Sequence, residues 1–380
     1  MAKTNQETAN PFVTSPAFSS VVIQHHLKSL AQPLNYWRST QQLPPVLLLS
    51  GPSGIGKRWM TSFIAQWIFC TESGFNASSS SGADSSGISP CGECLSCKKM
   101  IHGTEVNFSV IQSDVDEETS RASTNSLKID QFRKLKSSQG FGAHQGQYRI
   151  TVIPDAERMT TQAANSILKL LEEPPRGWIF FITCADSALL LPTLVSRCQV
   201  LRLKPFTSND IQKLLISTET PPERAEMCAQ LSQGSWNRAT TFANEAIWKQ
   251  RAVLFDFLTQ PIQEFHGLMD WAAEEPTHFD ILTDLLEQFT ADLIRWSVSP
   301  FITHPENFNW IHSDGSKSFC SHVKKVVKAQ GSLDHAQAFW FSRAERMAQV
   351  REEALAPLNR KILLQDLLLP WIGALELDLS

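Results

Sequence analysis

Five short apolar runs alternate with segments of helix length in the first part of the chain. The runs are Val46–Ser50, Phe108–Gln112, Arg149–Ile153, Trp178–Thr183 and Gln199–Leu203. Strands that are apolar at successive positions are typical of a parallel sheet that helices cover on both faces. The pattern therefore predicts an α/β domain over residues 1–205, built on a parallel five-stranded sheet.

After this domain the pattern becomes helical. The segment "FTSNDIQKLL" predicts the start of a small helical unit over residues 206–249, with Ser208 as the helix cap. From residue 250 onward apolar residues recur at helical spacing, and six of them make one continuous stripe. The stripe consists of Leu282, Leu285, Leu286, Phe289, Leu293 and Trp296. We expect an all-helical domain over residues 250–380, with this stripe in its core rather than in a recognition groove.

Two polar stretches interrupt the first domain. Residues 72–90 include "SSSSGADSSG", a composition that forms flexible chain and cannot pack a core. Residues 113–126 are also polar and predict a second loop. The first stretch is therefore expected to be a flexible insertion and the second a loop.

The overall composition narrows the class of protein. Hydrophobic residues make up 42% of the chain and charged residues 19%, which is typical of a soluble globular protein. No apolar run approaches the ~18 residues that a transmembrane helix needs. The sequence "MAKTNQETANPF" lacks the features of a signal peptide, so we expect a cytoplasmic protein. The formal net charge of −4, without a basic tail, does not indicate nucleic-acid binding by bulk electrostatics.

The first predicted strand leads into the glycine-rich segment "GPSGIGKR". Its spacing, with Gly51, Gly54, Gly56 and Lys57, matches a phosphate-binding loop, in which backbone N–H groups and a helix N-terminus point at phosphate oxygens. The next residue is normally Ser or Thr, whose hydroxyl holds Mg²⁺. Arg58 stands there instead, and a guanidinium has no lone pair to offer a cation. The loop either retains a phosphate cradle without its metal ligand or is a glycine turn that binds no nucleotide.

The eight cysteines fall into two groups. Three of them, Cys91, Cys94 and Cys97, have a spacing that converges on one metal ion, and Cys70 can close the set across the polar insertion. Four thiolates suit a tetrahedral Zn²⁺ with no open position, which predicts a structural site. The alternative is a surface loop with free thiols. The other cysteines are scattered and are expected to be small buried side chains; they are Cys184, Cys198, Cys228 and Cys320.

Two further motifs carry a family resemblance: "NSILKLLEEPP" over Asn165–Pro175 and "LVSRC" over Leu194–Cys198. With the glycine loop and the cysteine knuckle, they make the chain resemble the clamp-loader subunits of bacterial DNA polymerase III, a branch of the AAA+ proteins. The likeness is strong over residues 22–203, where it also includes "SLKIDQFRKL". It is weaker in "LSQGSWNRA" and "LNRKILLQDLLL".

The resemblance implies a domain plan and a set of partners. It implies an AAA+ core over residues 1–205 with a zinc module at about 70–97, a helical lid over 206–249, and a helical collar for oligomerisation over 250–380. Five such subunits, including gamma/tau and delta, form an open ring that uses ATP to load the sliding clamp onto primed DNA.

The resemblance also implies roles for individual residues. Arg197, next to Ser196, takes the position of an arginine finger, which completes the ATP site of a neighbouring subunit and stabilises the charge that develops during phosphoryl transfer. Arg238 resembles a lid arginine that senses nucleotide. The alternative for Arg197 is an ordinary surface salt bridge, and the alternative for Arg238 is to fix the lid against the core.

Hydrolysis by the chain itself is not expected. Alignment on "NSILKLLEEPP" places Pro154 where active relatives carry the Mg²⁺-binding aspartate, and Asp155 where they carry the catalytic glutamate. Since Arg58 has replaced the other oxygen ligand, both protein ligands of the metal are missing. We therefore expect a non-hydrolysing subunit that binds ATP weakly or not at all and supplies Arg197 in trans.

Three alternatives remain open at this stage. An ATP-hydrolysing gamma/tau-type motor would need substitute metal ligands, such as Ser53 or Asp155. A stand-alone P-loop kinase with a zinc-stabilised lid leaves "LLEEPP", the Ser-Arg-Cys motif and the helical tail unexplained. A DNA-binding zinc knuckle would use Lys98 and Lys99, but the knuckle also carries Glu93, and no series of stacking aromatic residues accompanies it.

Overall fold

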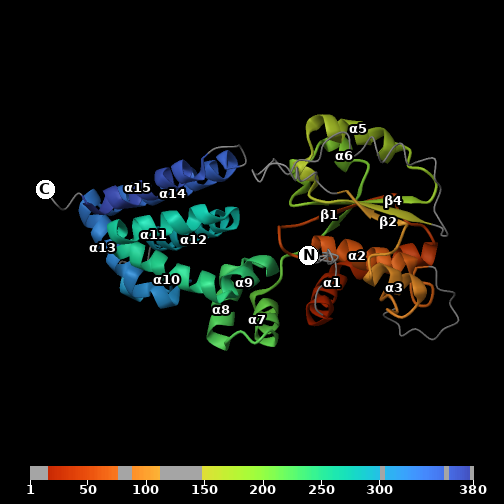
Figure 1. Cartoon of the computed structure of the whole chain (residues 1–380), viewed down its shortest axis with the longest axis horizontal. Helices are drawn as coiled ribbons and strands as arrows, with labels where there is room; N and C mark the ends of the chain where they lie inside the picture. The colour runs from red at the N-terminus through yellow and green to blue at the C-terminus, as the bar shows by residue number, and fades with distance from the viewer. Residues whose placement is uncertain (1–15, 76–87, 112–147, 300–303, 355–358, 377–380) are drawn as a thin grey trace, which may run out of the picture. The chain divides into compact units, whose positions relative to one another are not determined.

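The computed structural model describes residues 16–75, 88–111, 148–299, 304–354 and 359–376. These residues form two compact units, shown in Figure 1. The first unit comprises residues 16–75, 88–111, 148–219 and 233–237. The second comprises 220–232, 238–299, 304–354 and 359–376.

A parallel five-stranded sheet lies at the centre of the first unit, as predicted. Its strands are β1 (Val46–Ser50), β2 (Phe108–Val110), β3 (Arg149–Ile153), β4 (Trp178–Cys184) and β5 (Gln199–Arg202). The strand order is β2-β3-β4-β1-β5. Every residue of β1 and β4 is buried, which explains why these strands are apolar at nearly every position. Ser50 pairs with Cys184 on one side and with Arg202 on the other, so these three strands end side by side.

Helices cover both faces of this sheet (Figure 1). On one face lie α1 (Pro16–Thr40), α2 (Lys57–Phe69) and α3 (Leu95–Ile101). On the other lie α5 (Thr161–Glu172) and α6 (Pro192–Val195). The first unit also contains α7 (Ser208–Ser217) and the 3₁₀ turns η2 (Ala156–Arg158) and η3 (Ser187–Leu189). This two-sided arrangement is the one that the alternating sequence pattern predicts.

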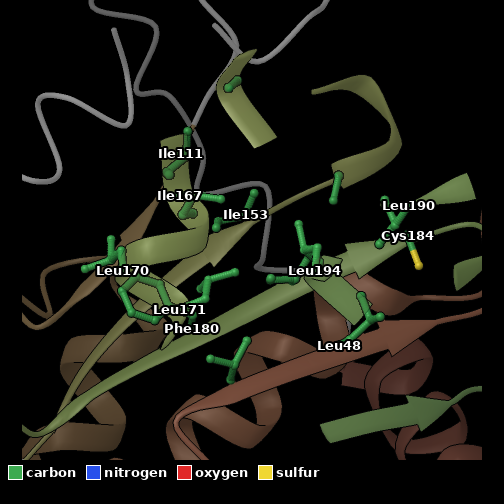
Figure 2. Close-up of a cluster of buried hydrophobic side chains, with 14 of the residues drawn as sticks. Leu48, Ile111, Ile153, Ile167, Leu170, Leu171, Phe180, Cys184, Leu190 and Leu194 are labelled. Atoms are coloured by element: carbon green, nitrogen blue, oxygen red, sulfur yellow. The ribbon is translucent and has the colours of Figure 1, made fainter. Parts of the chain in front are cut away.

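An apolar cluster holds α5 and α6 against the sheet, as Figure 2 shows. Ile167, Leu170 and Leu171 of α5 recur at helical spacing and are buried against the sheet, where Phe180 of β4 belongs to the same cluster. Leu194 of α6 joins them. The cluster therefore fixes the C-terminal end of α5 and the whole of α6 on one rigid support.

The second unit is helical throughout its described residues, which confirms the expectation for this part of the chain. Its helices are α8 (Pro222–Leu231), α9 (Trp236–Ala243, whose first two residues belong to the first unit), α10 (Glu245–Thr259), α11 (Pro261–Glu274), α12 (Pro276–Ser297), α13 (Ser316–Gln330), α14 (Leu333–Glu353) and α15 (Arg360–Glu376), with 3₁₀ turns η4 (Pro305–Asn307) and η5 (Ser313–Gly315). All six residues of the predicted apolar stripe are buried along α12. No described helix combines the length and the apolarity needed to cross a bilayer.

One prediction about a helix terminus is wrong. The cap of α7 is Thr207, not Ser208, because Thr207 keeps an extended backbone and its hydroxyl accepts a hydrogen bond from the Asp210 N–H at 3.1 Å. Ser208 is already the first helical residue. The domain boundaries at 205 and 249 stay predictions. Most of the polar insertion at 72–90, the loop at 113–126 and the segment "SLKIDQFRKL" lie outside the described residues.

Candidate functional site

The predicted glycine loop connects β1 to α2, and its glycines are required by its geometry. Gly54 and Gly56 have φ angles of 77° and 88°, in the left-handed region that favours glycine. A Cβ on Gly51 would lie 2.6 Å from the Leu203 carbonyl oxygen at the end of β5. The loop is therefore a tight structure against the sheet, and it brings these three glycines together with Lys57 at the start of α2.

Lys57 points back into this loop. Its Nζ donates to the carbonyl oxygens of Gly51 at 2.6 Å and Pro52 at 2.9 Å, and the residue is only 7% exposed. Burial lowers the pKa of the ammonium, while the nearby charges of Glu157 and Asp155 oppose that shift. In this conformation the charge that a phosphate loop offers to a nucleotide is engaged by the loop's own carbonyl groups.

Arg58 and Asp155 form an ion pair at the end of the sheet. Asp155 follows β3 with a left-handed backbone (φ 48°), and its N–H donates to Thr183 Oγ1 of the neighbouring strand at 3.0 Å. Glu157 Oε1 accepts from the Ala185 N–H at 3.1 Å. The guanidinium that replaces the usual hydroxyl thus binds the carboxylate that could have served as a substitute metal ligand.

Two further segments contact the loop: His26 of α1, which the sequence did not single out, and residues 235–237 of the motif "LSQGSWNRA", whose contact with the loop was not predicted. His26 of α1 is buried, and its Nε2 lies 2.8 Å from the Ile55 carbonyl oxygen, to which it can donate. The Asn237 N–H donates to the Gly54 carbonyl oxygen at 3.4 Å, and a Cβ on Gly54 would lie 2.1 Å from Ser235 Oγ. His26 could have been recognised as an inward-facing residue, since it falls on the helical spacing of the buried Val22 and Leu30.

Arg197 lies in the turn directly after α6 and belongs to the first unit. Its Nε donates to Glu172 Oε1 at 2.9 Å, and its Nη2 pairs with the same oxygen. Its Nη1 donates to the Thr193 carbonyl oxygen at 2.6 Å and to Ser196 Oγ at 3.3 Å. Ser196 Oγ in turn donates to Thr193, at 3.1 Å. The salt bridge considered as the alternative role of Arg197 is therefore present, and its partner is the first glutamate of "LLEEPP".

Arg238 is assigned to the second unit, whereas the loop residues with which it was grouped belong to the first. Its Nε is 3.4 Å from Asp284 Oδ2 in α12. Asp284 also pairs with Arg351 of α14. The contact with Asp284 joins α9 to α12, and the role of Arg238 towards nucleotide stays a prediction.

The four cysteines of the predicted metal site converge. The sulfur atoms of Cys70, Cys91, Cys94 and Cys97 all lie within 4.8 Å of one another. A tetrahedral ion with metal–sulfur bonds of 2.3 Å places its ligands about 3.8 Å apart, and Cys91 Sγ lies 3.9 Å from Cys97 Sγ. The predicted grouping is confirmed, and the residues fit a metal such as zinc.

Backbone N–H groups already point at these sulfur atoms. Cys91 N donates to Cys70 Sγ at 3.4 Å, and Cys94 N and Cys97 N donate to the preceding cysteine of the motif. Burial opposes ionisation of Cys70, but these bonds and those from Ser73 outweigh it and lower its pKa to about 6. The pKa of Cys94 is also lowered, whereas burial raises the pKa values of Cys91 and Cys97. A bound dication would favour the thiolate form of all four.

The four scattered cysteines lie elsewhere in the fold. Cys184 and Cys228 are buried, as expected, whereas Cys198 and Cys320 are partly exposed. The Cys198 thiol donates to the Leu194 carbonyl oxygen at 3.1 Å, and burial raises its pKa to about 12. Among the described residues, the cluster of potential metal ligands consists of Cys70, Cys91, Cys94 and Cys97 and includes none of these four.

The chain is similar to known DNA polymerase III subunits. The family described as "DNA polymerase III, delta subunit" matches residues 27–207. DNA polymerase III subunit delta' of Pseudomonas aeruginosa is 27% identical over 334 residues, which cover 85% of this chain and 90% of that protein. Subunit tau of Escherichia coli is 27% identical over 237 residues, which cover 60% of this chain but 33% of that protein. A solved structure of a gamma subunit-related protein from Thermotoga maritima is 16% identical, covers 90% of this chain and 99% of that one, and gives a TM-score of 0.43.

Proposed function

We propose, from the similarity of this chain to delta-prime subunits of DNA polymerase III, that it is the clamp-loader subunit that hydrolyses no ATP itself and supplies Arg197 to the ATP site of a neighbour. The partners under this proposal are gamma/tau and delta subunits in a five-membered ring, and through the ring the sliding clamp and primed DNA. Such a subunit acts in the cytoplasm, with the replication machinery.

The observation that carries the proposal is the Arg58–Asp155 ion pair. Metal-assisted phosphoryl transfer requires oxygen ligands that hold Mg²⁺ against the β- and γ-phosphates. Here residue 58 is a cation, residue 154 is a proline, and one candidate replacement, Asp155, is held in an ion pair by Arg58. Lys57, bound to the loop carbonyl groups, supports the same conclusion.

Arg197 has the properties that action in trans requires. It is exposed at a surface turn of the first unit, and the turn is held by the buried Leu194 and by α6. A guanidinium placed against a γ-phosphate of the neighbouring subunit would bind its oxygens with two parallel charge-assisted hydrogen bonds. This charge is most valuable in the transition state, and such fingers accelerate hydrolysis by about 10³- to 10⁵-fold.

One experiment tests both halves of the proposal. The purified chain is expected to release no phosphate from Mg·ATP above the buffer rate. A complex reconstituted from this chain and its gamma/tau and delta partners is expected to hydrolyse ATP, and Arg197→Ala is expected to reduce the rate by about 10³-fold at the dependent site. Steady turnover by the purified chain, or an unchanged rate in the Arg197→Ala complex, would refute the corresponding half.

The second candidate function is an ATP-hydrolysing motor of the gamma/tau type. It requires Asp155 or Ser53 to bind Mg²⁺, and the Asp155 carboxylate is held by Arg58. Titration of the purified chain with ATP distinguishes the two, because a motor binds the nucleotide more tightly when Mg²⁺ is added, and the non-hydrolysing subunit does not.

We further propose that the ion held by the four cysteines is structural Zn²⁺, since four thiolates leave no open coordination position. The purified chain is expected to contain one zinc per molecule by atomic absorption. Cys97→Ser is expected to abolish the bound zinc and to expose the segment after α2 to proteases. Cys320→Ser, which changes a cysteine of the second unit, serves as the control and should retain the zinc. Full zinc content in Cys97→Ser would contradict the assignment.

A further inference from the structure

The guanidinium of Arg197 is almost fully engaged within its own subunit. Of the five N–H donors that an arginine carries, Nε and one on Nη2 bond to Glu172, and the two on Nη1 bond to Thr193 and Ser196. The edge formed by Nε and Nη2 is one that binds a carboxylate or a phosphate bidentately. Glu172 therefore occupies an edge of the guanidinium that a phosphate would use.

The pair is well supported but open to solvent. Glu172 is the last residue of α5 and Arg197 follows α6, and both helices are fixed on the sheet by the cluster in Figure 2. The side chains themselves are 44% and 32% exposed. The backbone positions are thus rigid, while the contact between the two charges can open without any change in the core.

We propose that Glu172 is a positioning residue that holds the Arg197 side chain by an ion pair in the free subunit. When the ring forms around nucleotide, Arg197 exchanges Glu172 for the phosphate of a neighbouring subunit's ATP. This inference rests on the proposed function of Arg197. The phosphate carries more negative charge than a carboxylate and offers more oxygen acceptors, so it can displace Glu172. Without nucleotide next to it, the arginine returns to Glu172 and does not present an unpaired charge to the interface.

Exchange implies competition, and competition predicts the direction of a mutational effect. Glu172→Gln keeps the size of the side chain but removes the charge with which the phosphate competes. At ATP concentrations well below saturation, the reconstituted complex with Glu172→Gln is expected to hydrolyse ATP about two- to five-fold faster, the size expected for the loss of one partly exposed ion pair. The saturated rate should change little, since the arginine is then already at the phosphate.

The adjacent glutamate provides the matched control. Glu173 is also exposed, so Glu173→Gln removes the same charge one residue away and should leave the rate unchanged. In an Arg197→Ala background, Glu172→Gln should have no effect, because Glu172 acts only through the arginine. A purely structural role for Glu172 would instead alter the rate by the same factor in both backgrounds.

The possible outcomes separate this inference from the proposed function. A faster rate in Glu172→Gln that depends on Arg197 supports the proposed exchange of Glu172 for phosphate. An unchanged or slower rate in Glu172→Gln, together with a large loss of rate in Arg197→Ala, overturns the proposed exchange but supports Arg197 as an arginine finger. If Arg197→Ala itself has no effect on the complex, the proposed function fails first, and the inference fails with it.

Discussion

The first unit contains two arginine–carboxylate pairs that differ in their surroundings. Asp155, the partner of Arg58, is fixed by its strained backbone and by Thr183, and it is the less exposed of the two carboxylates. Glu172, the partner of Arg197, is 44% exposed at a helix end. Lys57 and Arg58 of the glycine loop are held by contacts with the loop carbonyl groups and with Asp155. Arg197 instead has an exposed partner, Glu172, that it can release.

The largest effect that we expect from this comparison is a loss of ATPase rate in the reconstituted complex when Arg197 is changed. Arg197→Lys retains the charge but loses the planar fork, and the loss of one donor to a transition state costs on the order of 100-fold. The matched change Arg58→Lys should leave the ATPase rate of the reconstituted complex within about twofold, because only an exposed ion pair is altered. A rate that responds more to Arg58→Lys than to Arg197→Lys would reverse the assignment of the two regions.

A second prediction concerns Lys57 and is expected to be seen in stability. Lys57→Met preserves the aliphatic volume but leaves the carbonyl groups of Gly51 and Pro52 without their donor, which should cost up to about 3 kcal/mol of unfolding free energy. Lys213→Met, on the exposed face of α7, is the control and should change little. Urea denaturation measures both. Equal stabilities for the two variants would show that Lys57 does not brace the loop.

The smallest predicted effect depends on pH. Burial lowers the pKa of His26 from 6.5 to about 4, with a further contribution from the neighbouring His25. The unfolded chain therefore takes up this proton first as the pH falls below 6.5, and stability declines until the folded pKa is reached. Between pH 7 and pH 5 the natural chain should lose about 2 kcal/mol more than His26→Gln, in which the amide can still donate to Ile55. Parallel losses in both proteins would show that His26 does not titrate in this way.

Much of the fold could be predicted because burial leaves a clear mark on sequence. The central strands β1 and β4 are apolar at nearly every position, and α12 repeats its apolar residues at helical spacing. The cap of α7 was missed by one residue, since Thr207 and Ser208 have equally suitable side chains and only the backbone of Thr207 is extended. Local side-chain chemistry alone does not distinguish adjacent capping residues.

The motifs of the candidate site could be predicted from the sequence, but the side-chain contacts between its elements could not. The spacing of Cys91, Cys94 and Cys97 fixes a shared ligand geometry, and the added Cys70 was correct because α2 ends there. The partners of Arg58 and Arg197 could not be read in this way. Each pair joins residues from different elements, with separations of 97 and 25 positions, and only the folded sheet brings them together.

The packing around Gly54 shows that a glycine of a phosphate-loop motif can be required by the fold itself. A side chain at this position would collide with Ser235 Oγ at 2.1 Å, and the backbone there is left-handed in any case. Selection on folding alone is then enough to preserve the glycine signature, whether or not a triphosphate ever enters. Surveys that count energy-consuming proteins by this signature will include chains in which the motif persists only as architecture.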